Sequence, residues 1–340
     1  MSTTPAIEVR DLKKTFRVPD RRPGMGGALR QLFRARTREV VAVDGISFSI
    51  APGERVAFVG PNGAGKSTTI KVLSGILHPD GGAAHVCGLV PWTQRRALGF
   101  LIGTVFGQRT QLWYHLPAGD TFDLLSYVYE QDPARYKDRR EALVEVFDLG
   151  PLLGKPVRQL SLGERMRCEI VASLLHAPEV LFLDEPTIGL DVDAKAIIRD
   201  LVRDRSREDG CTVLLTSHDT GDMERVCDRV IVIHEGRLLL DQPVRELRQS
   251  YIRRKVITLH TAETRIELAL PGVTVVGREP HRTVLEVDTD ITPVGKVVGN
   301  ALAGVKITDL TVEDPPMEEI VQAIYASASP THDASPGGAR

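Results

Sequence analysis

Residues 56–76 read VAFVGPNGAGKSTTIKVLSGI, an apolar strand pattern that runs into a glycine-rich stretch and then into a helical pattern. The spacing of Gly60, Gly65, Lys66 and Ser67 is that of a phosphate-binding loop between a strand and a helix. Glycines let the backbone curl so that several N–H groups point at phosphate, and the helix N-terminus adds the positive end of its dipole. The residues expected to hold phosphate are Gly60, Pro61, Asn62, Gly63, Ala64, Gly65, Lys66, Ser67 and Thr68.

Two side chains of this loop have separate expected tasks. Lys66 should reach the β- and γ-phosphates of a nucleotide, and the Ser67 hydroxyl should ligate Mg2+. Further along the chain, the apolar run VLFLDEP (180–186) ends in two carboxylates. Asp184, at the strand end, is expected to hold Mg2+ directly or through water, and Glu185 to orient and polarise the attacking water. Lys66 and Glu185 are therefore candidate catalytic residues.

Short apolar runs alternate with helical patterns through residue 245, which indicates an α/β fold. Several of the runs are almost wholly apolar, as expected of strands that are covered on both faces. From residue 250, half-buried strand patterns and a helix with Val294, Val297, Val298 and Leu302 on one face predict a small α+β domain without catalytic residues. In the first part of the chain, strands are expected at 40–43, 46–50, 56–60, 180–184, 212–217 and 229–234.

Residues 17–38 interrupt the early strands and carry seven arginines against one acid, Asp20. Leu29, Leu32 and Phe33 fall at helical spacing, so a short basic amphipathic helix near anionic lipid is one interpretation. A solvated surface insertion is the other, and the glycine-rich PGMGG (23–27) favours it.

The stretch QLSLGERMRCEIVASLLHAPEVLFLDEPTIGLD (159–191) resembles the ATP-binding cassette (ABC) ATPases, with signature motif, Walker B and D-loop in the family's order. The family's LSGGQ is here LSLGE, so Leu162 replaces a glycine and Glu164 replaces a glutamine. The resemblance implies that Ser161 and Gly163 contact the γ-phosphate of an ATP. Ser161 and Glu164 also have the spacing of a helix capping box, and a capped helix N-terminus aimed at phosphate serves both purposes.

Other motifs of the family fall in register. The resemblance implies that Asp191 belongs to the D-loop and that His218, after the strand TVLLTS, is the switch histidine at the γ-phosphate. It implies a Q-loop glutamine that contacts Mg2+ and water, with Gln108 favoured over Gln111 by its spacing to a leucine further along the chain. Phe16 stands where the family stacks an aromatic ring on adenine, although a core position at a strand end is the alternative.

The resemblance covers residues 6–245 and extends, more weakly, to single-cassette ATPases of drug-resistance exporters. It implies a P-loop NTPase fold of the ABC type with a helical subdomain, followed by the small α+β domain. The expected boundaries are 1–249 for the ATP-binding domain, with the basic insertion at 17–38 and the Q-loop and helical subdomain at 109–177, then 250–326 for an accessory or regulatory domain and 327–340 for a disordered tail.

Composition narrows the class of protein. The 340 residues carry 43 Lys and Arg against 45 Asp and Glu, so no general basic field for nucleic acid is present. Four scattered cysteines without a CxxC pair indicate neither a disulfide framework nor a zinc site, which fits a reducing compartment. The longest uncharged apolar stretch, 97–108, is well short of the roughly 20 residues that cross a bilayer.

One phosphate loop and one signature per chain predict a twofold homodimer, because in the family each signature meets the other cassette's ATP. The resemblance implies ATP hydrolysis with Mg2+, a peripheral place on the cytoplasmic face of the membrane, and separate permease subunits with no nucleic-acid partner. Trp113, Tyr114 and His115 are candidate permease contacts, with local core packing as the alternative. Export is favoured over import, and a soluble translation-factor-like or regulatory ABC ATPase is the competing hypothesis.

Overall fold

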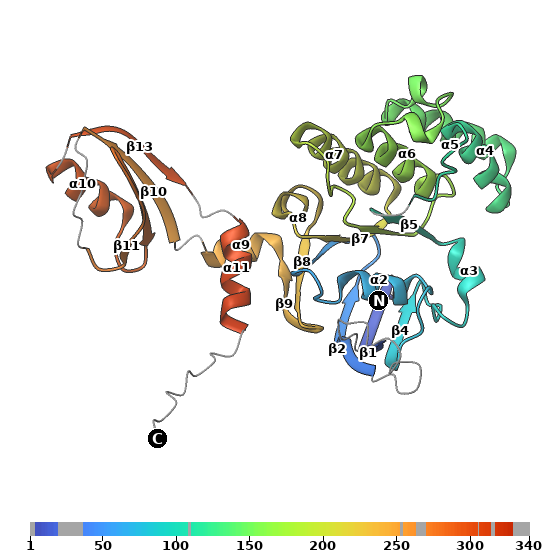
Figure 1. Ribbon diagram of the computed structural model, residues 1–340, viewed down its shortest axis with the longest axis horizontal. Coiled ribbons are helices and arrows are strands. Elements are labelled where there is room, and N and C mark those ends of the chain that lie inside the picture. The colour runs from blue at the N-terminus through green and yellow to red at the C-terminus, as the bar shows by residue number, and fades with distance from the viewer. Residues whose placement is uncertain are drawn as a thin grey trace, which may run out of the picture. The chain divides into compact units, whose positions relative to one another are not determined.

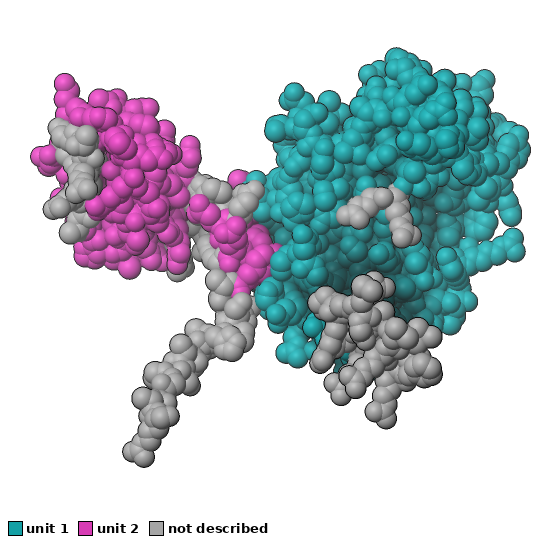
Figure 2. Space-filling view, viewed as in Figure 1, with its two compact units in different colours: residues 1–242 teal, residues 243–340 magenta. Residues whose placement is uncertain are grey.

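The computed structural model describes residues 4–19, 37–107, 110–251, 254–262, 270–304, 306–313 and 317–328. The chain forms two compact units, residues 1–242 and 243–340 (Figure 2). The helix over Val244–Tyr251, α9, belongs to the second unit and lies across the boundary expected after residue 249. Gln108, most of the basic insertion and the tail at 329–340 lie outside the described residues.

The first unit is built on a six-stranded sheet in the order β5-β6-β7-β3-β8-β9 (Figure 1). Its neighbours from β5 to β8 pair in parallel, and β3 and β7 are buried along their whole length. Positive φ at Glu235 and Gly236 gives the tight turn of the β8–β9 hairpin. The strands are β3 (Arg55–Val59), β5 (Ile102–Phe106), β6 (Val180–Asp184), β7 (Thr212–Ser217), β8 (Arg229–His234) and β9 (Arg237–Pro243).

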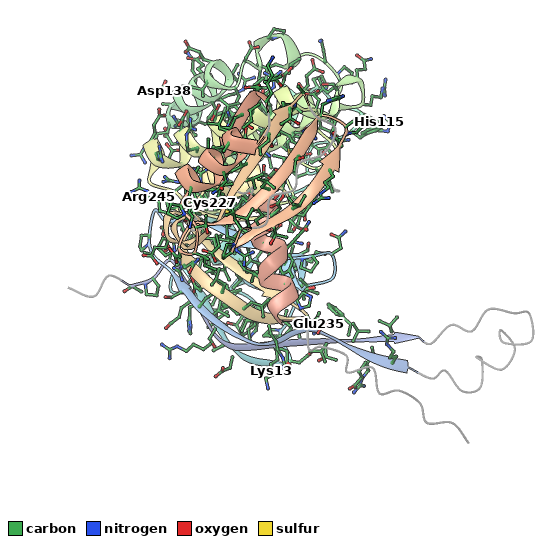
Figure 3. The ribbon with its side chains drawn as sticks, turned by 90° about the vertical axis from the view of Figure 1, so that its left-hand side faces the viewer. Lys13, His115, Asp138, Cys227, Glu235 and Arg245 are labelled. Atoms are coloured by element: carbon green, nitrogen blue, oxygen red, sulfur yellow. The ribbon has the colours of Figure 1, made fainter. Side chains whose placement is uncertain are left out.

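A second, antiparallel sheet in this unit has the order β2-β1-β4. The strands expected at 40–43 and 46–50 are one continuous strand, β2 (Thr37–Ile50), which pairs with β1 (Ile7–Pro19) in a long ribbon (Figure 3). The third strand is β4 (Gly81–Val86). Buried side chains of both sheets share one core, in which the Phe48 and Phe58 ring centroids lie 5.7 Å apart. This core holds the ribbon against the phosphate-loop strand.

Helices surround the six-stranded sheet, and α4 to α6 gather at one end of it (Figure 1). Helix α5 begins sharply, because Asp132 caps it and Pro133 takes its first position. The helices are α2 (Lys66–Leu73), α3 (Arg95–Gly99), α4 (Ala118–Val128), α5 (Pro133–Val146), α6 (Leu162–Leu174), α7 (Val192–Asp209) and α8 (Thr220–Val226), with 3-10 turns at Gly150–Leu152 and Val157–Gln159.

The second unit holds a four-stranded antiparallel sheet in the order β11-β12-β10-β13, with α10 packed on it. Val297 and Ala301 of α10 are buried, whereas Leu302, expected on the same face, is 61% exposed. The buried face of α10 includes Val297 and Ala301 but not Leu302, so the prediction that Leu302 lies on the apolar face is wrong. The elements are β10 (Arg254–Thr261), β11 (Val273–Glu279), β12 (Arg282–Asp288), α10 (Val294–Gly304), β13 (Ile307–Glu313) and α11 (Met317–Ala328).

No helix in the described part of the chain is both long and apolar enough to span a membrane.

Replacing Phe182 of β6 by Ala should lower the free energy of unfolding by about 3–5 kcal/mol, because it opens a cavity under the sheet where the ring is fully buried. Urea unfolding followed by circular dichroism measures the loss. Tyr127→Ala is the control, since Tyr127 is 79% exposed and should change stability by less than about 0.5 kcal/mol. Equal losses in the two variants would contradict the buried position of Phe182.

Candidate functional site

The glycine-rich loop is wedged between β2 and β8, and its glycines are required there. A Cβ on Gly60 would lie 2.4 Å from the Ile233 carbonyl oxygen, and one on Gly65 would lie 2.2 Å from that of Ala42. Gly65 also has φ +104, which L side chains rarely adopt. The first helical bond joins the Thr69 N–H to the Gly65 carbonyl. The preceding amides of the first turn therefore have no intrahelical acceptor and are available to an anion.

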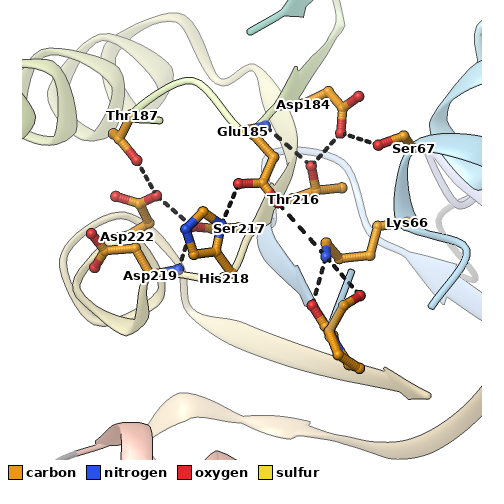
Figure 4. Close-up of polar contacts among 12 residues, drawn as sticks. Lys66, Ser67, Asp184, Glu185, Thr187, Thr216, Ser217, His218, Asp219 and Asp222 are labelled. Atoms are coloured by element: carbon orange, nitrogen blue, oxygen red, sulfur yellow. Dashed lines mark hydrogen bonds and ion pairs between the residues drawn. The ribbon is translucent and has the colours of Figure 1, made fainter. Parts of the chain in front are cut away.

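Lys66 begins α2, and its ammonium lies among oxygen atoms. Its Nζ donates to the carbonyls of Gly60 (2.6 Å) and Pro61 (3.2 Å) and lies 3.7 Å from Glu185 Oε1 (Figure 4). Burial lowers the pKa of Lys66, while the charges of Glu185 and Asp184 oppose that shift. Because an anion favours the charged form of a buried amine, a phosphate bound here would stabilise the ammonium.

Asp184, at the end of β6, connects the loop to the sheet. Its Oδ1 accepts hydrogen bonds from the Ser67 hydroxyl at 2.9 Å and the Thr216 hydroxyl at 2.6 Å (Figure 4). The Ser67 and Asp184 oxygens are hard ligands that converge beside the phosphate loop, so they fit Mg2+. The described residues contain no cluster of three or more His, Cys, Asp or Glu side chains that could hold a metal. Water and phosphate oxygens would have to complete the coordination, as is usual for Mg2+.

Glu185 and His218 form a close polar pair. Glu185 Oε2 lies 2.5 Å from His218 Nδ1, across from the Lys66 ammonium (Figure 4). Glu185 has φ +57, an uncommon conformation for a residue with a side chain, and its N–H donates to the Thr216 carbonyl. The surrounding strands thus hold a strained turn that aims the carboxylate at the phosphate loop, and such strain concentrates at functional sites.

The signature and D-loop residues form a second cluster. Ser161 caps α6 through a complete capping box, in which Glu164 N–H donates to Ser161 Oγ at 3.2 Å and Ser161 N–H donates to Glu164 Oε2 at 2.8 Å. The Ser161 N–H holds the pKa of Glu164 below its usual range. Asp191 caps α7 by accepting from the Ala194 N–H. Both helix starts line one hollow of about 390 Å³, together with Leu162, Gly163 and Gly189.

The structure thus gathers the expected residues into two clusters, one at the phosphate loop and one at the signature hollow. Lys66, Ser67, Asp184, Glu185 and His218 meet at the carboxyl edge of the sheet. No residue of the phosphate loop lines the signature hollow.

The aromatic and glutamine candidates have mixed surroundings. Phe16 is half-buried on β1 opposite Val40, with the Lys14 ammonium 5.6 Å from its ring centroid. Gln108 lies outside the described residues. The competing Gln111 donates its side-chain amide to the Glu169 backbone carbonyl at 3.0 Å. Trp113, Tyr114 and His115 are all exposed rather than packed in a core.

Sequence reasoning missed the polar residues that support the site from behind. Thr216 bonds Asp184, and Ser217 and Thr187 bond the buried carboxylate of Asp222. The available signal was the polar Thr-Ser pair that ends the otherwise apolar run TVLLTS.

Comparison with known proteins gives the family. Residues 43–188 match the model of the ABC transporter family. The chain is 34% identical over 284 residues to the daunorubicin resistance ATP-binding protein DrrA3 of Streptomyces coeruleorubidus, covering 82% of this chain and 89% of that protein. It is 36% identical to the Nod factor export ATP-binding protein I of Ralstonia nicotianae, covering 63% and 66% of the two chains.

A solved structure shares the fold: the dimeric, post-hydrolysis state of an ATP-binding cassette bound to ADP and Pi has a TM-score of 0.58 at 22% identity, covering 70% of this chain and 99% of that one. The relatives named above share this chain's sequence, and the solved cassette shares its fold. The chain accordingly belongs to the ABC transporter family as an ATP-binding, ATP-hydrolysing subunit.

Proposed function

We propose that this ATPase works as a twofold homodimer that powers export through separate membrane permeases. One observation supports the dimer: within one chain, the phosphate-loop cluster and the signature hollow are separate sites. A twofold axis would place each Ser161 against the nucleotide held by the other protomer's loop, so two half-sites make two complete sites. The related cassette described above was solved as a dimer, which supports this arrangement.

Each protomer would divide the chemistry between its elements. The first-turn amides of α2 and the Lys66 ammonium bind and orient the β- and γ-phosphates. Glu185 acts as general base by accepting the proton of the attacking water, and His218 holds that carboxylate through their contact. Ser67 and Asp184 would hold Mg2+, with Gln108 as a further contact, and a bound Mg2+ would supply positive charge beside the phosphates.

The adenine would lie beside the β1–β2 ribbon. Phe16 pairs with Val40, which is two residues along β2 from Ala42, the residue packed against Gly65. Two residues of strand span about 7 Å, so the Phe16 ring lies within reach of a base whose phosphates sit in the loop. Stacking needs only the face of the ring.

ATP closes such a dimer only through contacts that are better in the closed state than in the open one. Ser161 and Gly163 of the opposite protomer would supply those contacts at the γ-phosphate. After hydrolysis the γ-phosphate is no longer attached, so the dimer can open. Asp191, which caps α7 in the same hollow, would face the same interface.

Coupling to export is supported by the relatives, since one is named a daunorubicin resistance ATP-binding protein and another a Nod factor export ATP-binding protein. The permease would dock near the exposed Trp113 and Tyr114, which would place the protein peripherally on the cytoplasmic face of the membrane. Residues 250–326 would form the accessory domain.

Co-purification from native membranes tests the permease. The tagged chain should retain a multi-span membrane protein in mild detergent, and the complex in lipid should show substrate-stimulated ATPase activity. Recovery only with ribosomes, or as a free dimer, would refute the coupling to transport.

Lys66→Ala should abolish hydrolysis and weaken MgATP binding, because the change removes the cation from the β- and γ-phosphates. Steady-state ATPase assays and fluorescent-nucleotide titration measure the two effects. Full activity in the folded variant would refute the assignment of the phosphate loop.

Glu185→Gln should lower the hydrolysis rate by about 10²-fold or more while ATP still binds, since the amide cannot take a proton. With hydrolysis blocked, MgATP should shift the protein from monomer to dimer, as seen by size-exclusion chromatography with light scattering. Adding Ser161→Arg should abolish the shift, because the larger side chain fills the signature hollow. A variant that traps ATP as a monomer would rule out the two-chain site.

Glu164→Gln in the Glu185→Gln background should lower the ATP concentration for half-maximal dimerisation by about two- to fivefold, the scale of a partly screened like-charge contact. The substitution removes a charge near the γ-phosphate, and Gln preserves the capping box. Glu145→Gln, an exposed helix position, is the control and should change nothing. If Glu164→Gln left the ATP concentration for half-maximal dimerisation unchanged or raised it, the charge of Glu164 would not face the nucleotide.

A further inference from the structure

Asp222, on α8, is a fully buried carboxylate that the proposed hydrolysis does not use. It is 0% exposed and accepts hydrogen bonds of 2.6 Å from the Thr187 and Ser217 hydroxyls (Figure 4). A third, also 2.6 Å, comes from Arg199 Nε. The three donors come from the D-loop segment, the end of β7 and α7. Losing these partners would leave an unpaired buried charge, which is energetically unfavourable. The three contacts therefore fix the three segments relative to one another.

Two of the donors adjoin the reacting pair. Thr187 is two residues after Glu185, and Ser217 directly precedes His218. Ser217 Oγ also accepts the Asp219 N–H at 2.9 Å, which fixes the backbone on the other side of His218. Glu185 and His218 follow different strands. The Asp222 carboxylate contacts neither of them directly but holds the chain next to each, through Thr187 and Ser217.

The third donor links this carboxylate to α7. Lys195 and Arg199 are four residues apart on one face of α7. The Lys195 ammonium lies 2.7 Å from Asp219, and Arg199 Nη2 lies 2.8 Å from the other oxygen of the same carboxylate. A Cβ on Gly221 would lie 2.8 Å from the Arg199 guanidinium, so the guanidinium packs directly against the backbone at the start of α8. Arg199 therefore supplies the charge that permits a carboxylate at position 222 to be buried.

We infer that Asp222 is a positioning residue for ATP hydrolysis, which holds Glu185 and His218 in register through Thr187 and Ser217 and ties both to α7 through Arg199. Helix α7 begins at Asp191, which lines the signature hollow. A shift of the D-loop would therefore move α7, and the Arg199–Asp222 contact would pass that shift on to Glu185 and His218. Asp222 contributes to the turnover rate and not to the binding of ATP, whose phosphates contact other residues.

Asp222→Asn tests the inference, since Asn keeps the size but loses the charge and one acceptor. We expect kcat to fall by about 10- to 100-fold, the effect of a displacement of roughly 1 Å at a reacting group, with KM for ATP within about threefold of the parent value. Asp204→Asn is the matched control, because Asp204 pairs with Arg203 on the exposed side of α7. It should leave both constants unchanged.

A second pair of variants separates positioning from folding. Thr187→Ser keeps the hydroxyl that donates to Asp222 and should retain kcat, whereas Thr187→Val keeps the shape, loses the hydroxyl and should lower kcat with KM preserved. Thermal unfolding of every variant gives the folded fraction. The inference is overturned if folded Asp222→Asn has the parent kcat, if the two Thr187 variants behave alike, or if kcat falls only in proportion to the folded fraction.

Discussion

The hydrogen bonds of Asp184 are the interaction on which the site depends. One carboxylate oxygen at the end of β6 accepts from Ser67 of the phosphate loop and from Thr216 of β7. The contact joins helix α2, which follows the glycine-rich loop, to strands β6 and β7. It is the only described side-chain hydrogen bond of Ser67, and beside it the Lys66 ammonium lies 3.7 Å from Glu185.

The buried parallel sheet makes this contact dependable. In such sheets ligands bind outside the carboxyl ends of the strands, and here β3, β6 and β7 deliver the loop, Asp184 and His218 to that edge. Apolar packing holds the strands from both faces, and this aligns the polar groups at their ends. The positive φ at Glu185 is tolerated because both neighbouring strands hold the turn.

The same packing underlies the proposed division of labour between two protomers. The signature begins α6 and the D-loop leads into α7, and the two caps meet in a hollow of their own. One chain therefore keeps the phosphate-loop cluster and the signature hollow apart. In the proposed homodimer, ATP would connect the two chains, so closure would depend on the nucleotide.

The sequence alone determined the phosphate loop, the paired carboxylates, the capped signature helix and most of the strands, because each depends on residues close together in the chain. The tertiary structure decided what comes from far apart: the fusion of the early strands into one ribbon, the exposure of Leu302, and the convergence of Thr187, Arg199 and Ser217 on Asp222. Periodicity reports which face of an element is apolar, whereas the partner of a buried polar group depends on how the elements pack.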